Sequence, residues 1–216
     1  MMKNRVNVML FIALIALVAV VSAGMPASVQ VITTKYGLHN DYVDANIVSG
    51  GNADLPNSPP IYLGWCVDTQ GVIWDGVSPL ETWIPYSTLD VIPNTVPPAN
   101  WQAINYIINH KGSANVYQIQ TAIWQLTSTG VGHHFGVPVS DPGVQSLLAA
   151  AASHPTWQPG QGDVYGVVLW QGGRIQAILI EVPIPPNVPE FPSIALPIAM
   201  ILGTVFVIRV VKQREN

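Results

Sequence analysis

Charged residues are scarce in this sequence: they make up only 9% of its 216 residues, while hydrophobic residues make up 49%. In soluble domains about a quarter of the residues are charged, so we expect part of this chain to contact lipid. Basic residues are rarest in the middle, where residues 24–188 hold three of them against ten acidic residues, a formal charge of −7. Duplex nucleic acid is excluded as a ligand, because phosphate binding needs clustered Lys and Arg side chains.

The N-terminus has the features of an export signal. Lys3 and Arg5 precede an almost unbroken apolar run over residues 8–21, and Val21-Ser22-Ala23 fits the small-x-small pattern of a cleavage site. This arrangement predicts a secretory signal peptide over residues 1–23. An uncleaved anchor or a buried helix is the alternative, although the run is short for a bilayer span.

The C-terminus combines a proline-rich stretch, an apolar segment and a basic end. The pattern predicts a semi-rigid linker over residues 183–190 and a transmembrane segment over residues 191–208. Arg209, Lys212 and Arg214 then predict a cytoplasmic tail over residues 209–216. By the positive-inside rule, the middle of the chain lies outside the cell.

A tripeptide before the apolar segment narrows this interpretation. Pro189-Glu190-Phe191, with its hydrophobic stretch and basic tail, resembles the PEF-CTERM sorting signal of archaeal envelope proteins. The resemblance implies an archaeal cell-surface protein and, as a partner, an archaeosortase-like enzyme that recognises and removes the tail. Without that processing the segment is a plain membrane anchor with the same topology.

The middle, residues 24–182, is long enough for one domain. Strand-like composition and alternation occur at residues 28–34, 61–67, 163–170 and 174–182. Helical periodicity begins after three residues that are good N-caps, namely Asn100, Asn115 and Asp141.

The order of these elements predicts the fold class. We expect residues 61–67 to form a hairpin with residues 72–74, and the last two strands to form one at Gln171-Gly172-Gly173. Strands, then helices, then strands predict an α+β domain with a β-sandwich or barrel-like core and a helical insertion.

Cys66 is the only cysteine, so it has no partner for an intramolecular disulfide in an exported chain. Three interpretations follow from the residue itself. Cys66 is an inert buried side chain, it pairs between two chains, or it is chemically engaged with another side chain.

Two segments around Cys66 favour the last interpretation. A predicted strand ends in Trp65-Cys66-Val67-Asp68, and a predicted helix carries Gln120-Thr121-Ala122-Ile123-Trp124. Together they resemble the thioester domains of bacterial surface adhesins, in which a Cys thiol displaces ammonia from a Gln amide. The resemblance implies that Cys66 is the thiol donor and Gln120 the acyl donor. It also implies supporting roles for Trp65, Asp68, Ala122, Ile123 and Trp124.

The chain departs from this family in two respects. Trp65 stands where the family often has Tyr, and Gln70 follows Cys66 at a spacing similar to that of complement-type thioesters. Gln70 is therefore an alternative acyl donor, although Gln120 is favoured because Ala-Ile-Trp is the specific part of the motif. His110 is our candidate for activating the incoming nucleophile.

Other chemistry is less favoured. His133-His134 has no acidic or Cys ligand at a zinc-like spacing, and we expect neither a metal nor a cofactor. A Cys66–His110 hydrolase needs an activated thiolate, which no feature of the sequence predicts. The seven tryptophans permit either a glycan-binding surface or ordinary core packing.

The sequence thus predicts an archaeal cell-surface adhesion protein rather than an enzyme. Its thioester would couple once to an amine or hydroxyl group of a surface protein or glycan, on another cell or on its own envelope. The alternative is a non-covalent surface binding or structural module, glycan-binding or not, with an inert Cys66.

Overall fold

The computed structural model describes residues 24–35, 42–57, 61–68, 82–127, 136–173 and 175–184. The predicted signal peptide, transmembrane segment and basic tail lie outside these residues, as do most of the predicted linker, Gln70 and His133-His134. No helix within the described ranges has both the length and the apolar character needed to cross a bilayer.

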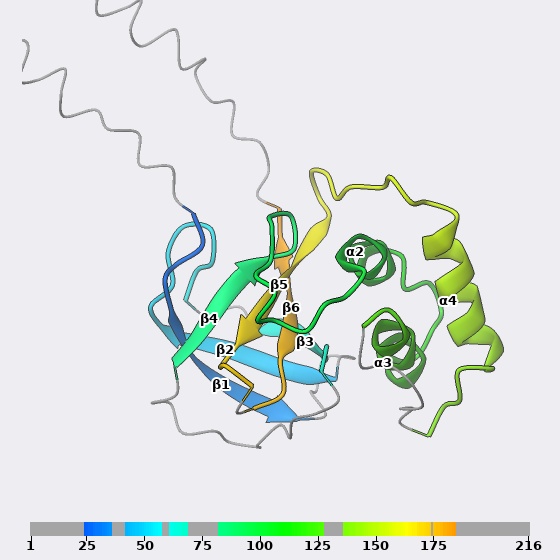
Figure 1. The fold of residues 1–216 in the computed structure, drawn as a ribbon, viewed down its shortest axis with the longest axis horizontal. Coiled ribbons are helices and arrows are strands. Elements are labelled where there is room, and N and C mark those ends of the chain that lie inside the picture. Colours follow the sequence, from blue (N-terminus) through cyan, green and yellow to red (C-terminus); the bar gives the residue numbers. More distant parts are fainter. Residues whose placement is uncertain are drawn as a thin grey trace, which may run out of the picture.

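Six described strands close into an antiparallel barrel in the order β1-β2-β3-β6-β5-β4 (Figure 1). Their bounds are β1 Val29–Lys35, β2 Val43–Ser49, β3 Tyr62–Cys66, β4 Thr82–Ser87, β5 Val164–Trp170 and β6 Ile178–Pro183. Side chains alternate between the two faces of a strand, and in β1 the residues Val29, Val31 and Thr33 are buried. The apolar core occupies the barrel and continues to the helices outside it.

Three helices lie between β4 and β5 in the sequence: α2 Trp101–Asn109, α3 Val116–Gln125 and α4 Pro142–Ala152. Each begins at its predicted cap, because the side chain of Asn100, Asn115 or Asp141 accepts from backbone N–H groups of the first turn. At the start of α3 the Gln118 side chain also accepts from the Asn115 N–H, which completes a capping box.

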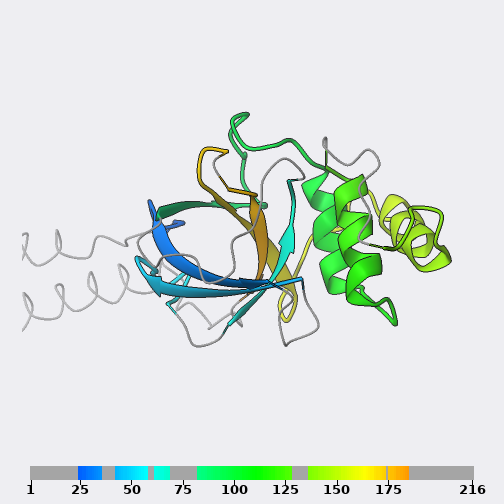
Figure 2. The same cartoon turned by 90° about the horizontal axis from the view of Figure 1, so that it is seen from below.

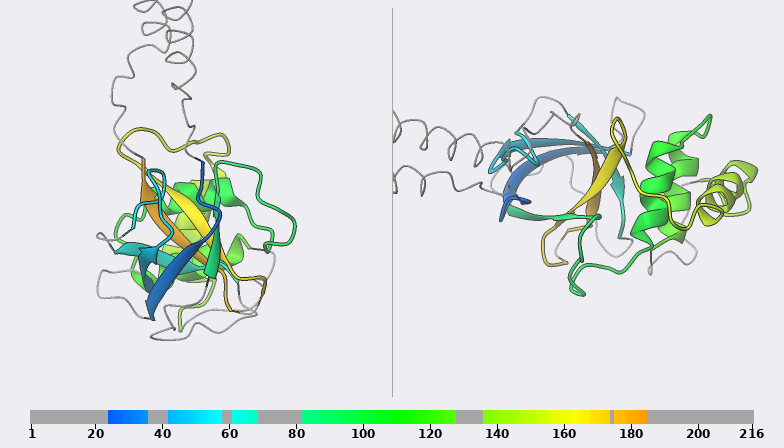
Figure 3. Two further views of the ribbon diagram at one scale, coloured as in Figure 1. Left: turned by 90° about the vertical axis from the view of Figure 1, so that its left-hand side faces the viewer. Right: turned by 90° about the horizontal axis from the view of Figure 1, so that it is seen from above.

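The helices cover one side of the barrel (Figure 2). Helix α2 contacts β5 and α3 contacts β3, while α4 packs on α2 and α3 as an outer layer. A backbone bond from the Asn100 N–H to the Leu126 carbonyl, 2.8 Å, joins the start of α2 to the end of α3. The segments that lead into β1 and out of β6 lie at the same end of the barrel (Figure 3).

The predicted α+β fold with a barrel-like core and a helical insertion is confirmed. The pairing of the last two strands is confirmed, since β5 pairs with β6, and Gly172 and Gly173 have φ of 68° and 80°. The predicted start of the second strand at residue 174 is wrong, because β6 begins at Ile178 and the connection is longer than the three residues expected. Within the described residues β3 pairs with β2 and β6, and residues 72–74 lie outside them. Pro183, which we assigned to the linker, is the last residue of β6.

Candidate functional site

The site begins where strand β3 extends past its neighbour β2. Pairing between the two strands ends at Val43 and Gly64, and the Tyr42 N–H adds one more bond to the Gly64 carbonyl, 3.2 Å. On its other edge β3 continues to pair with β6 as far as Cys66 and Ile178. Among the strands of the described residues, none lies opposite the backbone N–H and C=O of Cys66 on the β2 side, although buried backbone groups need partners.

The side chain of Gln120 fills this place. The Cys66 N–H donates to Gln120 Oε1 at 2.9 Å, and Gln120 Nε2 donates to the Cys66 carbonyl at 2.8 Å. Both residues are fully buried. One carboxamide thus makes the two hydrogen bonds that a neighbouring strand would make, and its carbonyl carbon is held opposite the Cys66 backbone.

Helix α3 brings Gln120 to the barrel because its buried face is continuous. Residues 119–124 are all buried, and the helix packs against β3. Ala122 and Ile123 have no exposed surface, and Trp124 is 6% exposed with its ring edge-on to Tyr42 at 6.1 Å. The predicted supporting residues of the helix therefore form an apolar layer around Gln120, which excludes water from the carboxamide.

The strand residues beside Cys66 are buried too. Trp65 has no exposed surface, and Asp68 is buried with its backbone carbonyl bonded to the Gln176 side chain. The Trp65 indole N–H donates to Glu181 Oε1 on β6 at 2.6 Å. The backbone of Asp68 is thus fixed just beyond the end of β3 by Gln176, and the Trp65 ring is held against β6 by Glu181.

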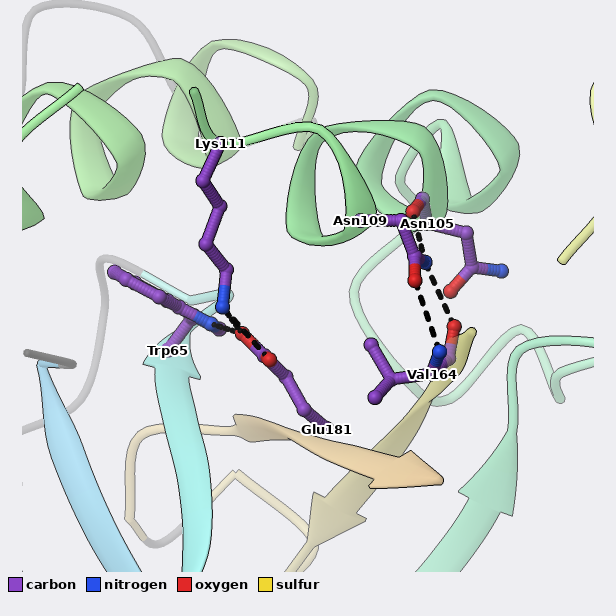
Figure 4. A network of polar contacts seen from close by, with 6 residues as sticks. All are labelled: Trp65, Asn105, Asn109, Lys111, Val164 and Glu181. Carbon is purple, nitrogen blue, oxygen red and sulfur yellow. Dashed lines mark hydrogen bonds and ion pairs between the residues drawn. The ribbon is translucent and has the colours of Figure 1, made fainter. Parts of the chain in front are cut away.

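The carboxylate of Glu181 also binds Lys111, in the loop between α2 and α3 (Figure 4). Lys111 Nζ lies 2.6 Å from Oε1 and 2.7 Å from Oε2, and 5.5 Å from the centroid of the Trp65 ring. Sequence reasoning missed this network, since 70 residues separate its two charges. The only hint of this ion pair in the sequence is that Lys111 is one of three basic residues between residues 24 and 188.

His110 lies in a different cluster. Its ring stacks on Tyr106 with centroids 4.1 Å apart, and its Nδ1 donates to the Tyr106 carbonyl at 2.9 Å. Tyr106 carries His154 as a second stacked ring, and Trp157 meets Tyr106 and His110 edge-on. These contacts are with α2 and the end of α4, not with Cys66 or Gln120, so the activating role of His110 stays a prediction.

A second amide pairs with the barrel as Gln120 does. Asn109 of α2 accepts from the Val164 N–H at 2.9 Å and donates to the Val164 carbonyl at 2.8 Å (Figure 4). One turn earlier, Asn105 Oδ1 accepts from the Gly166 N–H at 2.9 Å. These bonds continue the edge of β5 beyond the end of β4. Side-chain amides therefore bind both α2 and α3 to strand edges of the barrel. Only the amide of α3 does so at a cysteine.

Most tryptophans of the described ranges are core residues, and the glycan-binding alternative stays a prediction. Trp65, Trp83, Trp124 and Trp170 are buried, and Trp101 and Trp157 are half-buried. In the same ranges no three His, Cys, Asp or Glu side chains are placed to hold a metal ion. The open hollow beside His110 and Lys111, about 360 Å³, lies between the α2–α3 loop and α4 rather than at Cys66.

Comparison with known proteins identifies the C-terminal segment. Residues 188–209 match the PEF-CTERM archaeal protein sorting domain, which confirms the sorting signal predicted from Pro189-Glu190-Phe191. No curated protein matches the chain.

Several solved structures are similar to the chain. The N-terminal domain of the pilus tip adhesin Cpa from Streptococcus pyogenes has 11% identity and a TM-score of 0.44, covering 76% of this chain and 97% of that one. The N-terminal thioester domain of a Clostridium perfringens surface protein has 11% identity and a TM-score of 0.38, covering 71% and 97%. That of the Streptococcus pyogenes fibronectin-binding protein SfbI has 10% identity and a TM-score of 0.37, covering 74% and 95%. The chain is thus similar to thioester-domain surface proteins in its middle and to archaeal PEF-CTERM proteins at its C-terminus.

Proposed function

We propose that this chain is an archaeal cell-surface adhesion protein in which Cys66 and Gln120 form an internal thioester. The thioester then couples covalently to an amine or hydroxyl group on a partner surface. The observation that carries the proposal is the double hydrogen bond between the Gln120 carboxamide and the Cys66 backbone, in a site without exposed surface. The sorting domain at residues 188–209 supports a location at the cell surface.

The proposed bond formation balances without a co-reactant. The Cys66 thiolate adds to the carbonyl carbon of Gln120, and the negative charge develops on Oε1. That oxygen already accepts the Cys66 N–H, a fixed donor of the kind that stabilises an oxyanion. Nε2 then leaves as ammonia, taking up the proton of the thiol, and a C–S bond has replaced the C–N bond.

Coupling to a partner is the same acyl transfer in a second step. A nucleophile adds to the thioester carbonyl, the C–S bond breaks, and the Cys66 thiolate takes up the proton that the nucleophile loses. Gln120 is left joined to the partner by an amide or an ester. No step regenerates the thioester, so the chain acts once and is not an enzyme in the sense of turnover.

Intact mass tests the proposal on the full chain in mild detergent. The wild-type mass should fall below the sequence mass by one ammonia, and Cys66→Ala and Gln120→Ala should each remove the deficit. Methylamine should add to the wild type and expose one thiol. Asn109→Ala is the matched control, because it removes an equivalent double hydrogen bond without a cysteine and should keep the deficit.

Two outcomes would redirect the assignment. Loss of the deficit in Gln70→Ala but not in Gln120→Ala would make Gln70 the acyl donor. A wild-type chain of full mass would favour the second candidate, a non-covalent surface module in which Gln120 only completes the edge of β3. The Asn109–Val164 pair is the observation behind that candidate, since the same bonds occur there with no reactive group.

A further inference from the structure

One carboxylate connects the strand that carries Cys66 to the loop that leads into the helix of Gln120. Glu181 lies on β6 and is 7% exposed. Its Oε1 accepts from the Trp65 indole at 2.6 Å, and both of its oxygens contact Lys111 Nζ (Figure 4). No other acidic side chain of the described residues forms an ion pair with Lys111.

The two partners of Glu181 are close in sequence to the two halves of the candidate site. Trp65 directly precedes Cys66 at the end of β3, where pairing with β2 has already stopped. Lys111 lies four residues before Asn115, the N-cap that fixes the first turn of α3. The contact between Lys111 and Glu181 therefore links the loop that leads into α3 to the strand that pairs with β3.

Because the contact is largely buried, it is sensitive to the loss of either charge. The Glu181 side chain is 6% exposed and that of Lys111 is 26% exposed, so removing one charge leaves the other poorly solvated. The Lys111 ammonium also lies 5.5 Å from the centroid of the Trp65 ring, within cation–π range. Both charges must be present for Trp65, Glu181 and Lys111 to keep their arrangement.

We infer that Glu181 and Lys111 are positioning residues for the Cys66–Gln120 reaction, because they set the offset between β3 and α3 at which the thiol faces the carboxamide. The inference rests on the proposed thioester. Neither residue touches the reacting atoms; each acts through the element to which it is bound. Orientation of this kind governs rate more than stability, since a displacement of about 1 Å can slow a reaction by roughly 100-fold.

The test measures the rate of ammonia loss and the free energy of unfolding in the same variants. Full chain is recovered unfolded from inclusion bodies in denaturant, and its full mass is checked to show that Gln120 still carries its amide. It is then diluted into detergent buffer, and intact mass is followed with time. Lys111→Met keeps the apolar stem without the charge, and Lys111→Arg restores a cation. Glu181→Gln keeps an acceptor for the Trp65 indole. Asn109→Ala is the control, because it removes two hydrogen bonds between α2 and β5 and keeps both charges of the Lys111–Glu181 pair.

We expect Lys111→Met and Glu181→Gln to slow ammonia loss by about tenfold or more, with Lys111→Arg recovering most of the rate. Asn109→Ala should lose stability but keep the wild-type rate. Wild-type rates in both Lys111→Met and Glu181→Gln would overturn the inference while leaving the thioester intact. Equal slowing in Asn109→Ala would overturn it too, since general loosening would then explain the effect. A wild-type chain that loses no ammonia would remove both proposals.

If Lys111→Met fails to fold, the rate of ammonia loss in Glu181→Gln tests the inference, and the same slowing is expected there. Adding an osmolyte separates the two explanations further, because it raises the stability of a loosened fold without restoring an ion pair. Recovery of the rate in osmolyte would contradict positioning. A rate that stays low while stability rises to the wild-type value would support it.

Discussion

A side-chain amide can take the place of a strand residue, because it offers one donor and one acceptor in a plane. Gln120 does this at Cys66 and Asn109 does it at Val164, each with two hydrogen bonds of 2.8–2.9 Å. The two amides differ in exposure, since Gln120 is fully buried and Asn109 is half-buried. Only Gln120 has a cysteine opposite it, so the candidate site is a variant of a helix–strand contact that also occurs at Asn109.

The difference in exposure predicts a difference in stability. In a Cys66→Ala background, which keeps the backbone groups and excludes the thioester, Gln120→Ala should lower the free energy of unfolding by about 2 kcal/mol or more. Asn109→Ala should cost about 1 kcal/mol, because water can reach the edge of β5 and replace the amide. Urea unfolding of the two variants measures both. Equal losses would contradict this account of the two helix–strand contacts.

The pairing of Cys66 with Gln120 could be predicted from sequence through the resemblance, but the hydrogen bonds between them could not. The motifs around Cys66 and Gln120 single out the two residues. Their hydrogen bonds depend on where β2 stops pairing with β3, and 54 residues separate the two sides. The contacts of Glu181 with Trp65 and Lys111 could not be predicted either, because an isolated acidic residue in an apolar strand gives no sign of its partners.

At the scale of elements, helices were easier to predict than strands. The caps Asn100, Asn115 and Asp141 act through bonds within a few residues, so the local sequence contains them. Strands β2 and β4 were missed. In β2 Asp44 and Asn46 alternate with apolar residues as in a strand, but Asp and Asn are depleted in strands, and in β4 Pro85 argues against a strand. Pro85 is tolerated because β1 pairs only with the first two residues of β4, Thr82 and Trp83.

Strand β3 depends on a close approach at Gly64. A Cβ at this position would lie 2.8 Å from the Val43 carbonyl oxygen and 3.3 Å from Ile178 Cγ2. Gly64→Ala should therefore cost about 1–3 kcal/mol and slow thioester formation, since Cys66 is two residues further along the strand. Thermal unfolding and intact mass report the two effects.

Gly160→Ala is the matched control for that substitution. A Cβ there would meet only Asp163 Oδ2, at 3.9 Å. We expect it to be neutral or to stabilise by about 0.4–1 kcal/mol, through the lower entropy of the unfolded chain. A Gly64→Ala variant as stable as Gly160→Ala would mean that β2 and β3 can separate without loss.

Helix α4 is joined to α3 by a capping carboxylate with an added partner. The Gln118 amide donates to Asp141 Oδ1 at 2.8 Å, and the N–H groups of Gly143 and Val144 donate to the same oxygen. The Gln118 bond has the largest effect on the pKa of Asp141 and lowers it. Desolvation opposes this effect, and the bonds from the Gly143 and Val144 N–H groups lower the pKa further, so that it lies below its ordinary value of 3.8.

This shift predicts the acid behaviour of the joint between α3 and α4. A lowered pKa in the folded state contributes stability that is present above the ordinary value of 3.8 and is lost as pH falls through the lowered value. Gln118→Ala should bring the pKa of Asp141 back toward 3.8 and reduce this acid-dependent loss. Titration of the Asp141 carboxyl by NMR in both proteins measures it. The same pKa in wild type and variant would contradict the assigned cause.

At the scale of the whole molecule, the barrel and the sorting domain are separate parts with separate signals. The sorting domain over residues 188–209 begins four residues after the last described residue, Ile184. The compositional contrast between an acidic middle and basic ends predicted this division from the sequence. What composition does not contain is the closure of the barrel, which depends on β1 meeting β4 through only two residue pairs.

The sorting domain predicts processing of the mature protein. If an archaeosortase-like enzyme removes the tail, chains extracted from the native envelope should lack residues 210–216. Mass spectrometry of C-terminal peptides from surface and total cell fractions measures this. Substituting Glu190 in the PEF tripeptide should retain the tail and serves as the control. Peptides from residues 210–216 in most of the surface fraction would leave a plain anchor with the same topology.

Strand β6 has a mechanical consequence for a chain tethered at its C-terminus and bonded through Gln120. Cys66 pairs with Ile178 at the start of β6, whereas the chain leaves the barrel after Pro183 at the other end, roughly 17 Å away at the usual strand rise. Tension between tether and captured partner would act along β6, which is hydrogen-bonded to β3 on one side and to β5 on the other. Force along a strand loads all its bonds at once, in shear, instead of breaking them one after another. A partner bonded to Gln120 as proposed would therefore pull in the direction in which the hydrogen bonds of β6 resist together.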